Sequence, residues 1–152
     1  MPILDISDKN LKFPVIGKPL FGWGGKGILI FNSRVELRKY KLSELKKSYV
    51  WQPRLKDFEE YSIDCALNFD GSISDFCIRK RLKTISGFAV IAENMYNPQV
   101  TAMTYRLLSS IRSAGACGIF NVQVLKKDMS YFFSDINPRI GTSAVFSFNQ
   151  GF

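Results

Sequence analysis

The chain has 152 residues, of which 46% are hydrophobic and 22% charged, and its formal net charge is +8. These values are typical of one ordinary globular domain and exclude an intrinsically disordered chain. No apolar run approaches the ~20 residues that a membrane-spanning helix needs, and the N-terminus lacks the basic start and apolar block of a signal peptide.

The residue types limit the chemistry that this chain can perform. Without histidine, it cannot build a Ser-His-Asp or Cys-His site or a histidine-ligated zinc site, so a bound metal would need oxygen ligands, which suits Mg²⁺ or Mn²⁺. Cys65, Cys77 and Cys117 form no CxxC motif, and we expect reduced thiols in a cytoplasmic protein. The positive charge favours anionic partners, and we interpret the cation clusters at 34–47 and 79–83 as solvated faces.

The first third of the chain predicts two strands joined by a glycine loop, then a helix. Strands are expected at 14–19 and 28–32, and the loop at 21–27. Residues 33–47 predict a helix with Ser33 as N-cap in a capping box, which Ser43 can interrupt or restart. Residues 48–52 predict an extended segment that ends at Pro53.

The remainder predicts more strands and one long helix. Residues 59–69 alternate with apolar side chains on one face, Asp70-Gly71 predicts a hairpin turn, and 72–82 return as a strand. Residues 84–97 are less regular. Residues 98–114 predict the clearest helix, which Gly115 closes, and 119–125 and 131–137 predict a further hairpin. This order of elements predicts an α+β fold with antiparallel sheets.

Two groups of residues suggest chemistry. The glycine loop, with Lys18 before it and Lys26 inside it, can bring backbone N–H groups close to phosphate oxygens, although a mobile hairpin is the alternative. Gln123 lies on one predicted strand, and Asp135 and Asn137 lie on the next, two residues apart, so all three can share a sheet face. Carboxylate and amide oxygens suit Mg²⁺, although a polar sheet edge is the alternative.

The segments FPVIGKPLFGWGGKGI, EEYSID, NVQV and YFFSDINPRIGTS stand in one order along residues 11–143. As an ordered set they resemble the ATP-grasp superfamily, closest to its carbamoyl-phosphate-synthase-like branch of carboxylate–amine ligases. The resemblance implies two small α+β subdomains with antiparallel sheets that clamp ATP. Residues 1–50 would form a partial lysine and glycine-loop subdomain, and 51–152 the metal-binding subdomain, of a single core. The expected activity is C–N bond formation through an acyl phosphate.

The resemblance also implies roles for individual residues. Lys18 would contact the ATP phosphates and Arg139 the transferred phosphoryl group, and Gln123, Asp135 and Asn137 would hold the metal. The remaining ATP-binding residues would be those of the lid loop, the adenine hinge at 51–55, the motif glutamate and a second phosphate-side loop: Gly24, Gly25, Lys26, Gly27, Gln52, Arg54, Leu55, Glu60 and Gly87.

Three features depart from the family pattern. Asp135 stands where the family has glutamate, and the hinge contains Pro53, which has no N–H with which to read a base. The chain also begins almost at the lysine strand, where the family has a preceding N-terminal domain. We therefore expect a fragment that a partner chain completes, or one that self-associates.

Three functional classes follow. The first is an ATP- and Mg-dependent ligase core, and the second is a catalytically degenerate nucleotide-binding module that regulates or supports a partner chain. The third, a basic nucleic-acid-binding domain, depends on net charge alone and is disfavoured. No membrane partner is expected. The carboxylate and amine substrates are not readable from the sequence, and Trp23 suits either lid packing or recognition.

Overall fold

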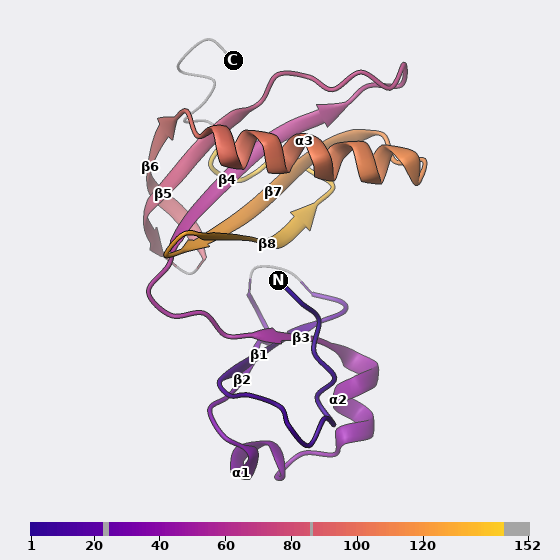
Figure 1. Ribbon diagram of the computed structural model, residues 1–152, viewed down its shortest axis with the longest axis vertical. Helices are drawn as coiled ribbons and strands as arrows, with labels where there is room; N and C mark the ends of the chain where they lie inside the picture. Colours follow the sequence, from indigo (N-terminus) through magenta and orange to yellow (C-terminus); the bar gives the residue numbers. More distant parts are fainter. Residues whose placement is uncertain (23–24, 86, 145–152) are drawn as a thin grey trace. The chain divides into compact units, whose positions relative to one another are not determined.

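A computed structural model describes residues 1–22, 25–85 and 87–144 of the chain. The chain divides into two compact units, residues 1–56 and residues 57–152, each drawn with its own sheet in Figure 1. The assignment of these units to the two halves of one nucleotide-binding core stays a prediction. Among the described residues, no helix is both long enough and apolar enough to cross a bilayer.

The smaller unit is a three-stranded antiparallel sheet with two short helices. Its strand order is β2-β1-β3, so β1 is the central strand. The elements are β1 (Val15–Pro19), β2 (Leu29–Phe31), α1 (Arg34–Leu37), α2 (Leu42–Ser48) and β3 (Tyr49–Pro53).

The core of the smaller unit forms around Trp51. Its indole is 2% exposed, stacks on the Phe31 ring at 5.3 Å and donates a hydrogen bond to the Leu45 carbonyl. A Cβ at Gly17 would lie 2.5 Å from the indole, so only glycine fits beneath this ring. Close packing of β1 against β3 therefore depends on the absence of a side chain at Gly17.

The helical prediction for residues 33–47, which allowed an interruption or restart at Ser43, is correct at its start, and the interruption comes slightly earlier, at residues 38–41. Ser33 caps α1, because its hydroxyl accepts the Glu36 N–H, and the Glu36 carboxylate accepts the Asn32 N–H at 2.7 Å. The chain leaves the helix after Leu37 and begins α2 at Leu42. Two helices therefore replace the single one.

The larger unit is a five-stranded antiparallel sheet with one long helix. Its order is β6-β5-β4-β7-β8, and α3 lies across one face of the sheet (Figure 1). The elements are β4 (Glu59–Leu67), β5 (Cys77–Ile85), β6 (Phe88–Met95), α3 (Pro98–Ser113), β7 (Gly118–Lys127) and β8 (Ser130–Asn137). Asn97 caps α3 by accepting the N–H groups of Gln99 and Val100.

The two faces of the larger sheet differ in character. Alternate strand residues pack with α3 to form the hydrophobic core, and the opposite face, here called the polar face, carries charged and amide side chains. The buried core residues are Tyr61, Ile63, Cys65, Leu67, Ile78, Val100, Leu108, Phe120, Val122 and Val124. Burial, followed by the nearby Asp64 charge, raises the pKa of the Cys65 thiol to about 12.

Three predictions for this unit need correction. Residues 84–97 contain strand β6, and the strand expected at 72–82 begins only at Cys77. Phe69, predicted to share the apolar face of β4, is 97% exposed because β4 ends at Leu67 and a turn follows. The 79–83 cluster is not a uniformly solvated face, since Arg79 is fully buried.

Candidate functional site

In the smaller unit, two predicted site residues share one face of the sheet. Lys18 opposes Val50, and Gln52 opposes Ile16, so these four side chains lie on the side away from Trp51 and Gly17. Gln52 is 8% exposed, and its Oε1 atom has no hydrogen-bond partner among the described residues. A buried amide oxygen without a donor is costly, so this position suits a ligand N–H group.

The other predicted residues of this unit flank the sheet. Gly25 and Gly27 have φ angles of 72° and 74°, which glycine adopts without strain, and Lys26 is exposed between them. Gly24 and Trp23 lie outside the described residues. Arg54 and Leu55 follow β3, and the Arg54 N–H donates to the Pro14 carbonyl at 3.0 Å.

In the larger unit, Glu60 and Gly87 both contact Arg81, a residue for which the sequence predicted no role at the site. Arg81 forms an ion pair with Glu60 and donates a hydrogen bond to the Gly87 carbonyl. Its side chain is 7% exposed, and its Nε atom is buried without a partner among the described residues. Arg81 therefore ties the motif glutamate of β4 to the turn before β6.

The three predicted metal ligands lie together on the polar face. Gln123 is directly opposite Asp135, Asn137 is opposite Asn121, and a bulge follows Gln123. The Asn137 side-chain amide donates to Asp135 Oδ2 at 3.2 Å, so its oxygen is the atom that can serve as a ligand. The described part of the chain holds no cluster of three or more His, Cys, Asp or Glu side chains suited to a metal. This group supplies one carboxylate and two amides.

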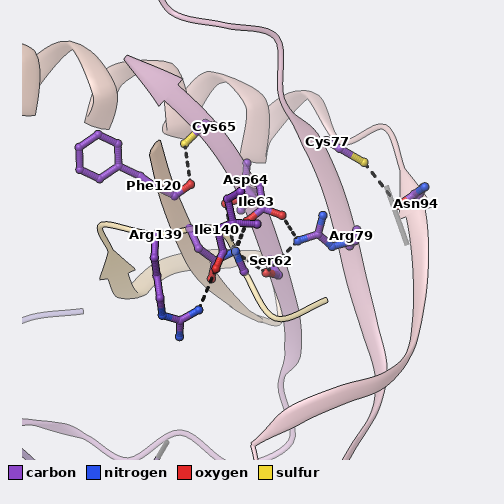
Figure 2. Close-up of polar contacts among 12 residues, drawn as sticks. Ser62, Ile63, Asp64, Cys65, Cys77, Arg79, Asn94, Phe120, Arg139 and Ile140 are labelled. Atoms are coloured by element: carbon purple, nitrogen blue, oxygen red, sulfur yellow. Dashed lines mark hydrogen bonds and ion pairs between the residues drawn. The ribbon is translucent and has the colours of Figure 1, made fainter. Parts of the chain in front are cut away.

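Arg139 stands two residues after Asn137 and is exposed. Its backbone N–H donates to the Asn137 carbonyl at 2.8 Å, and its guanidinium donates to the Ile140 carbonyl at 2.9 Å (Figure 2). Asn137 and Arg139 are therefore joined by one tight turn at the end of β8.

Four polar residues beside this group were not predicted from the sequence: Ser62, Arg79 and Asn121, which are buried, and Asp64, which is partly buried. Arg79 is 0% exposed and forms an ion pair with Asp64, and Figure 2 shows its guanidinium directed at Asp64 and Ser62. The one sequence signal was the period of two, which places Ser62 and Asp64 on the face opposite Tyr61 and Ile63. The strand register that brings Arg79 to them was not readable.

Comparison with solved structures identifies the fold. N5-carboxyaminoimidazole synthetase from Staphylococcus aureus, complexed with ADP, superposes with a TM-score of 0.72 at 18% identity, over 90% of this chain and 37% of its own. The chain has the ATP-grasp fold. No family profile matches the sequence, and no curated protein matches it by sequence.

Two further structures support the same assignment of fold. The biotin carboxylase domain of the Hydrogenobacter thermophilus 2-oxoglutarate carboxylase, in complex with MgADP and bicarbonate, has a TM-score of 0.71 at 13% identity, over 88% of this chain and 32% of its own. Biotin carboxylase from Campylobacter jejuni has a TM-score of 0.70 at 15% identity, over 90% and 33%. The chain thus spans about a third of these proteins, and the expected two-sheet α+β architecture is confirmed.

Proposed function

We propose that this chain is the ATP- and Mg²⁺-dependent core of a carboxylate–amine ligase of the carbamoyl-phosphate-synthase-like kind. A substrate carboxylate oxygen would attack the γ-phosphorus of ATP and release ADP, and an amine or ammonia would then displace phosphate from the acyl phosphate and lose a proton. The observation that carries the proposal is the fold that this chain shares with enzymes solved with ADP. In this chain, the smaller sheet carries Lys18 on one face, and the larger sheet carries the Gln123–Asp135–Asn137 group on its polar face.

The smaller unit carries groups suited to the nucleotide. Lys18 would neutralise phosphate charge, and the backbone N–H groups of Gly25 and Gly27 would approach phosphate oxygens closely. The Gln52 Oε1 atom, which has no partner among the described residues, would accept a hydrogen bond from the adenine amino group. That group would supply the donor that this buried oxygen lacks. Phosphoryl transfer depends mainly on such positioning and charge neutralisation.

The larger unit carries groups suited to Mg²⁺. Gln123, Asp135 and Asn137 would hold the ion, which would supply positive charge to offset that of the phosphates. Their oxygens fit, because Mg²⁺ keeps several waters and needs few protein ligands. Arg139, exposed beyond Asn137, would neutralise charge that develops on the transferred phosphoryl group.

The donor set also favours a second candidate function. Asp135 is the single carboxylate among the three proposed ligands, and it is one methylene shorter than the glutamate of the family pattern. A nucleotide-binding module that has lost catalysis and needs a partner chain would have this composition. Both candidates predict Mg-ATP binding, and only the ligase predicts turnover.

Thermal unfolding with and without Mg-ATP tests the nucleotide site. At a ligand concentration one hundred times the dissociation constant, one-site binding stabilises the fold by ~2.7 kcal/mol. We expect this shift in the wild-type chain and its loss in Lys18→Ala, because the phosphate charge then lacks a counter-charge. Lys39→Ala, an exposed lysine in the same unit, is the matched control. Equal shifts in both variants would contradict the role of Lys18.

Product analysis separates the two candidates once binding is established. The ligase predicts ADP formation that requires both a carboxylate and an amine or ammonia. ADP formation that stays at background across a panel of carboxylates, in a chain that binds Mg-ATP, would support the binding module.

A further inference from the structure

The larger unit keeps an ion pair on its polar face that its hydrophobic core does not require. Arg79 is 0% exposed and pairs with Asp64, whose side chain is 17% exposed, and Arg79 also lies 3.5 Å from the Ser62 hydroxyl (Figure 2). Apolar residues of similar volume often stabilise a fold as well as a buried ion pair does. The pair therefore calls for an explanation beyond the stability of the sheet.

The second oxygen of Asp64 supplies that explanation. Asp64 Oδ1 accepts the backbone N–H of Gly141 at 2.7 Å and the Asn121 side-chain amide at 2.8 Å. Gly141 is buried, and a Cβ there would lie 2.8 Å from Asp64 Oδ1 and closer still to Asn121 Nδ2. The segment after β8 thus rests directly on the polar face, fastened by one carboxylate.

This attachment lies beside the proposed metal and phosphate residues. Asn121, which Asp64 orients, is directly opposite Asn137. Gly141 follows Arg139 by two residues, and Ser143 and Ala144 beyond it are buried. The chain from Asn137 to Ala144 is therefore held at both ends, and the exposed Arg139 lies between them.

We propose that Asp64, held by Arg79, is a positioning residue that docks the segment 138–144 through the Gly141 amide and so fixes Asn137 and Arg139 for Mg-ATP. The inference rests on the proposed function, because only that function assigns Mg-ATP as the ligand of Asn137 and Arg139. Groups that orient metal ligands typically change metal affinity or activity 10- to 100-fold when they are replaced. We expect an effect of that size for Asp64.

Two substitutions disturb the attachment by different routes. Asp64→Asn keeps the shape of the side chain but has one acceptor oxygen where the carboxylate has two. Its NH₂ group is a hydrogen-bond donor, and so are the Arg79 and Asn121 groups that contact Asp64 in the wild type. Gly141→Ala keeps the Asp64–Arg79 pair and displaces the segment by the bulk of one methyl group. Should Asp64→Asn fail to fold, Gly141→Ala tests the same attachment. Asp128→Asn, at an exposed turn with a φ of 53° that asparagine tolerates, is the matched control.

Isothermal titration of the folded proteins with Mg-ATP, and with ATP in EDTA, measures the effect. We expect the dissociation constant for Mg-ATP to rise at least ~10-fold in Asp64→Asn and Gly141→Ala and to stay at the wild-type value in Asp128→Asn. The dissociation constant for metal-free ATP should differ less among the four proteins than that for Mg-ATP, because Asn137 would act only through the metal. A residue that only stabilises the fold would lower the unfolding temperature without changing this metal-dependent part of the affinity.

An NMR measurement separates failure of the inference from failure of the proposed function. Hydrogen exchange at the residue-141 amide should be slow in the wild type and in Asp128→Asn, and faster in Asp64→Asn. If that amide is released and Mg-ATP still binds with unchanged affinity, the positioning role of Asp64 is overturned and the proposed function stands. A wild-type chain that binds no Mg-ATP overturns both, whatever the amide shows.

Discussion

The Arg79 side chain is buried in the larger unit, where it forms an ion pair with the Asp64 carboxylate. An ion inside a protein loses its hydration, and its partner must compensate for that loss. Removal of one partner therefore costs more than removal of both, because the remaining charge has lost its counter-ion.

We predict that Arg79→Met lowers the free energy of unfolding by about 3–5 kcal/mol, the usual cost of breaking a buried pair. The double variant Asp64→Asn/Arg79→Met should recover part of this loss, because it leaves neither a buried cation nor a carboxylate without its counter-ion. Urea denaturation of the wild type, both single variants and the double variant measures the coupling. Strictly additive losses would show that Arg79 and Asp64 do not act as a pair.

Individual site residues differ in how far the sequence predicts them. Asp135 and Asn137 are two apart on a strand, so their shared face follows from strand geometry alone. Arg79 lies in a basic run that suits solvent, and its partner Asp64 is fifteen residues earlier on another strand. Only the register between β4 and β5 brings them together, and a sequence does not state register.

At the scale of elements, β4 is the central strand of the larger sheet, and Glu59 at its start links it to both neighbours. The Glu59 carboxylate accepts the Tyr61 hydroxyl at 2.6 Å and forms ion pairs with Lys80 of β5 at 3.0 Å and Lys126 of β7 at 3.5 Å. The Tyr61 hydrogen bond, followed by the one from Lys80, lowers the pKa of Glu59 to about 2.

We predict a pH-dependent contribution from Glu59. Because its pKa is lower in the folded chain than the ordinary ~4.3, its stabilisation is complete above about pH 5 and is lost as the pH falls toward 2. The carboxylate is 40% exposed, so solvent screening keeps the contribution below ~1 kcal/mol. Unfolding free energies of the wild type and Glu59→Gln, measured between pH 2 and 7, should converge at the acid end. A constant difference would contradict the assignment.

The Tyr61→Phe variant isolates the largest cause of this shift. It removes the hydroxyl donor and leaves the buried ring, so the pKa of Glu59 should rise toward its ordinary value when the side-chain carboxyl is titrated by NMR.

Elements with a clear periodicity were predictable, and those without one were not. In α3, apolar residues recur every three or four positions, Asn97 caps the start and Gly115 closes the end, so several local signals agree. In β6, the run FAVIAENM lies at the sheet edge with Phe88, Val90 and Ile91 about half exposed, so its sequence does not alternate. The break between α1 and α2 contains neither proline nor glycine.

For the whole molecule, the fold persists at low sequence identity to the enzymes that share it. The superpositions cover 88–90% of this chain at 13–18% identity. The fold tolerates such sequence divergence because apolar periodicity and turn positions define the strands more than particular residues do. Fold alone does not assign activity, so the function depends on the residues of the site. We propose that Asp135, the single carboxylate among the three predicted metal ligands, decides between a ligase and a binding module.

The division into two units leads to the last prediction. Residues 57–152 contain all five strands of the larger sheet, α3 and a core of their own, so this fragment should fold without the rest of the chain. A cooperative urea transition by circular dichroism and a dispersed NMR spectrum are the expected results. A control fragment of residues 72–152 lacks the central strand β4, which separates β5 from β7, and should be unfolded. Residues 1–56 should be marginal alone, because a domain near 60 residues buries only ~60% of its unfolded surface. An unfolded 57–152 fragment would show that the larger sheet needs the smaller unit for its stability.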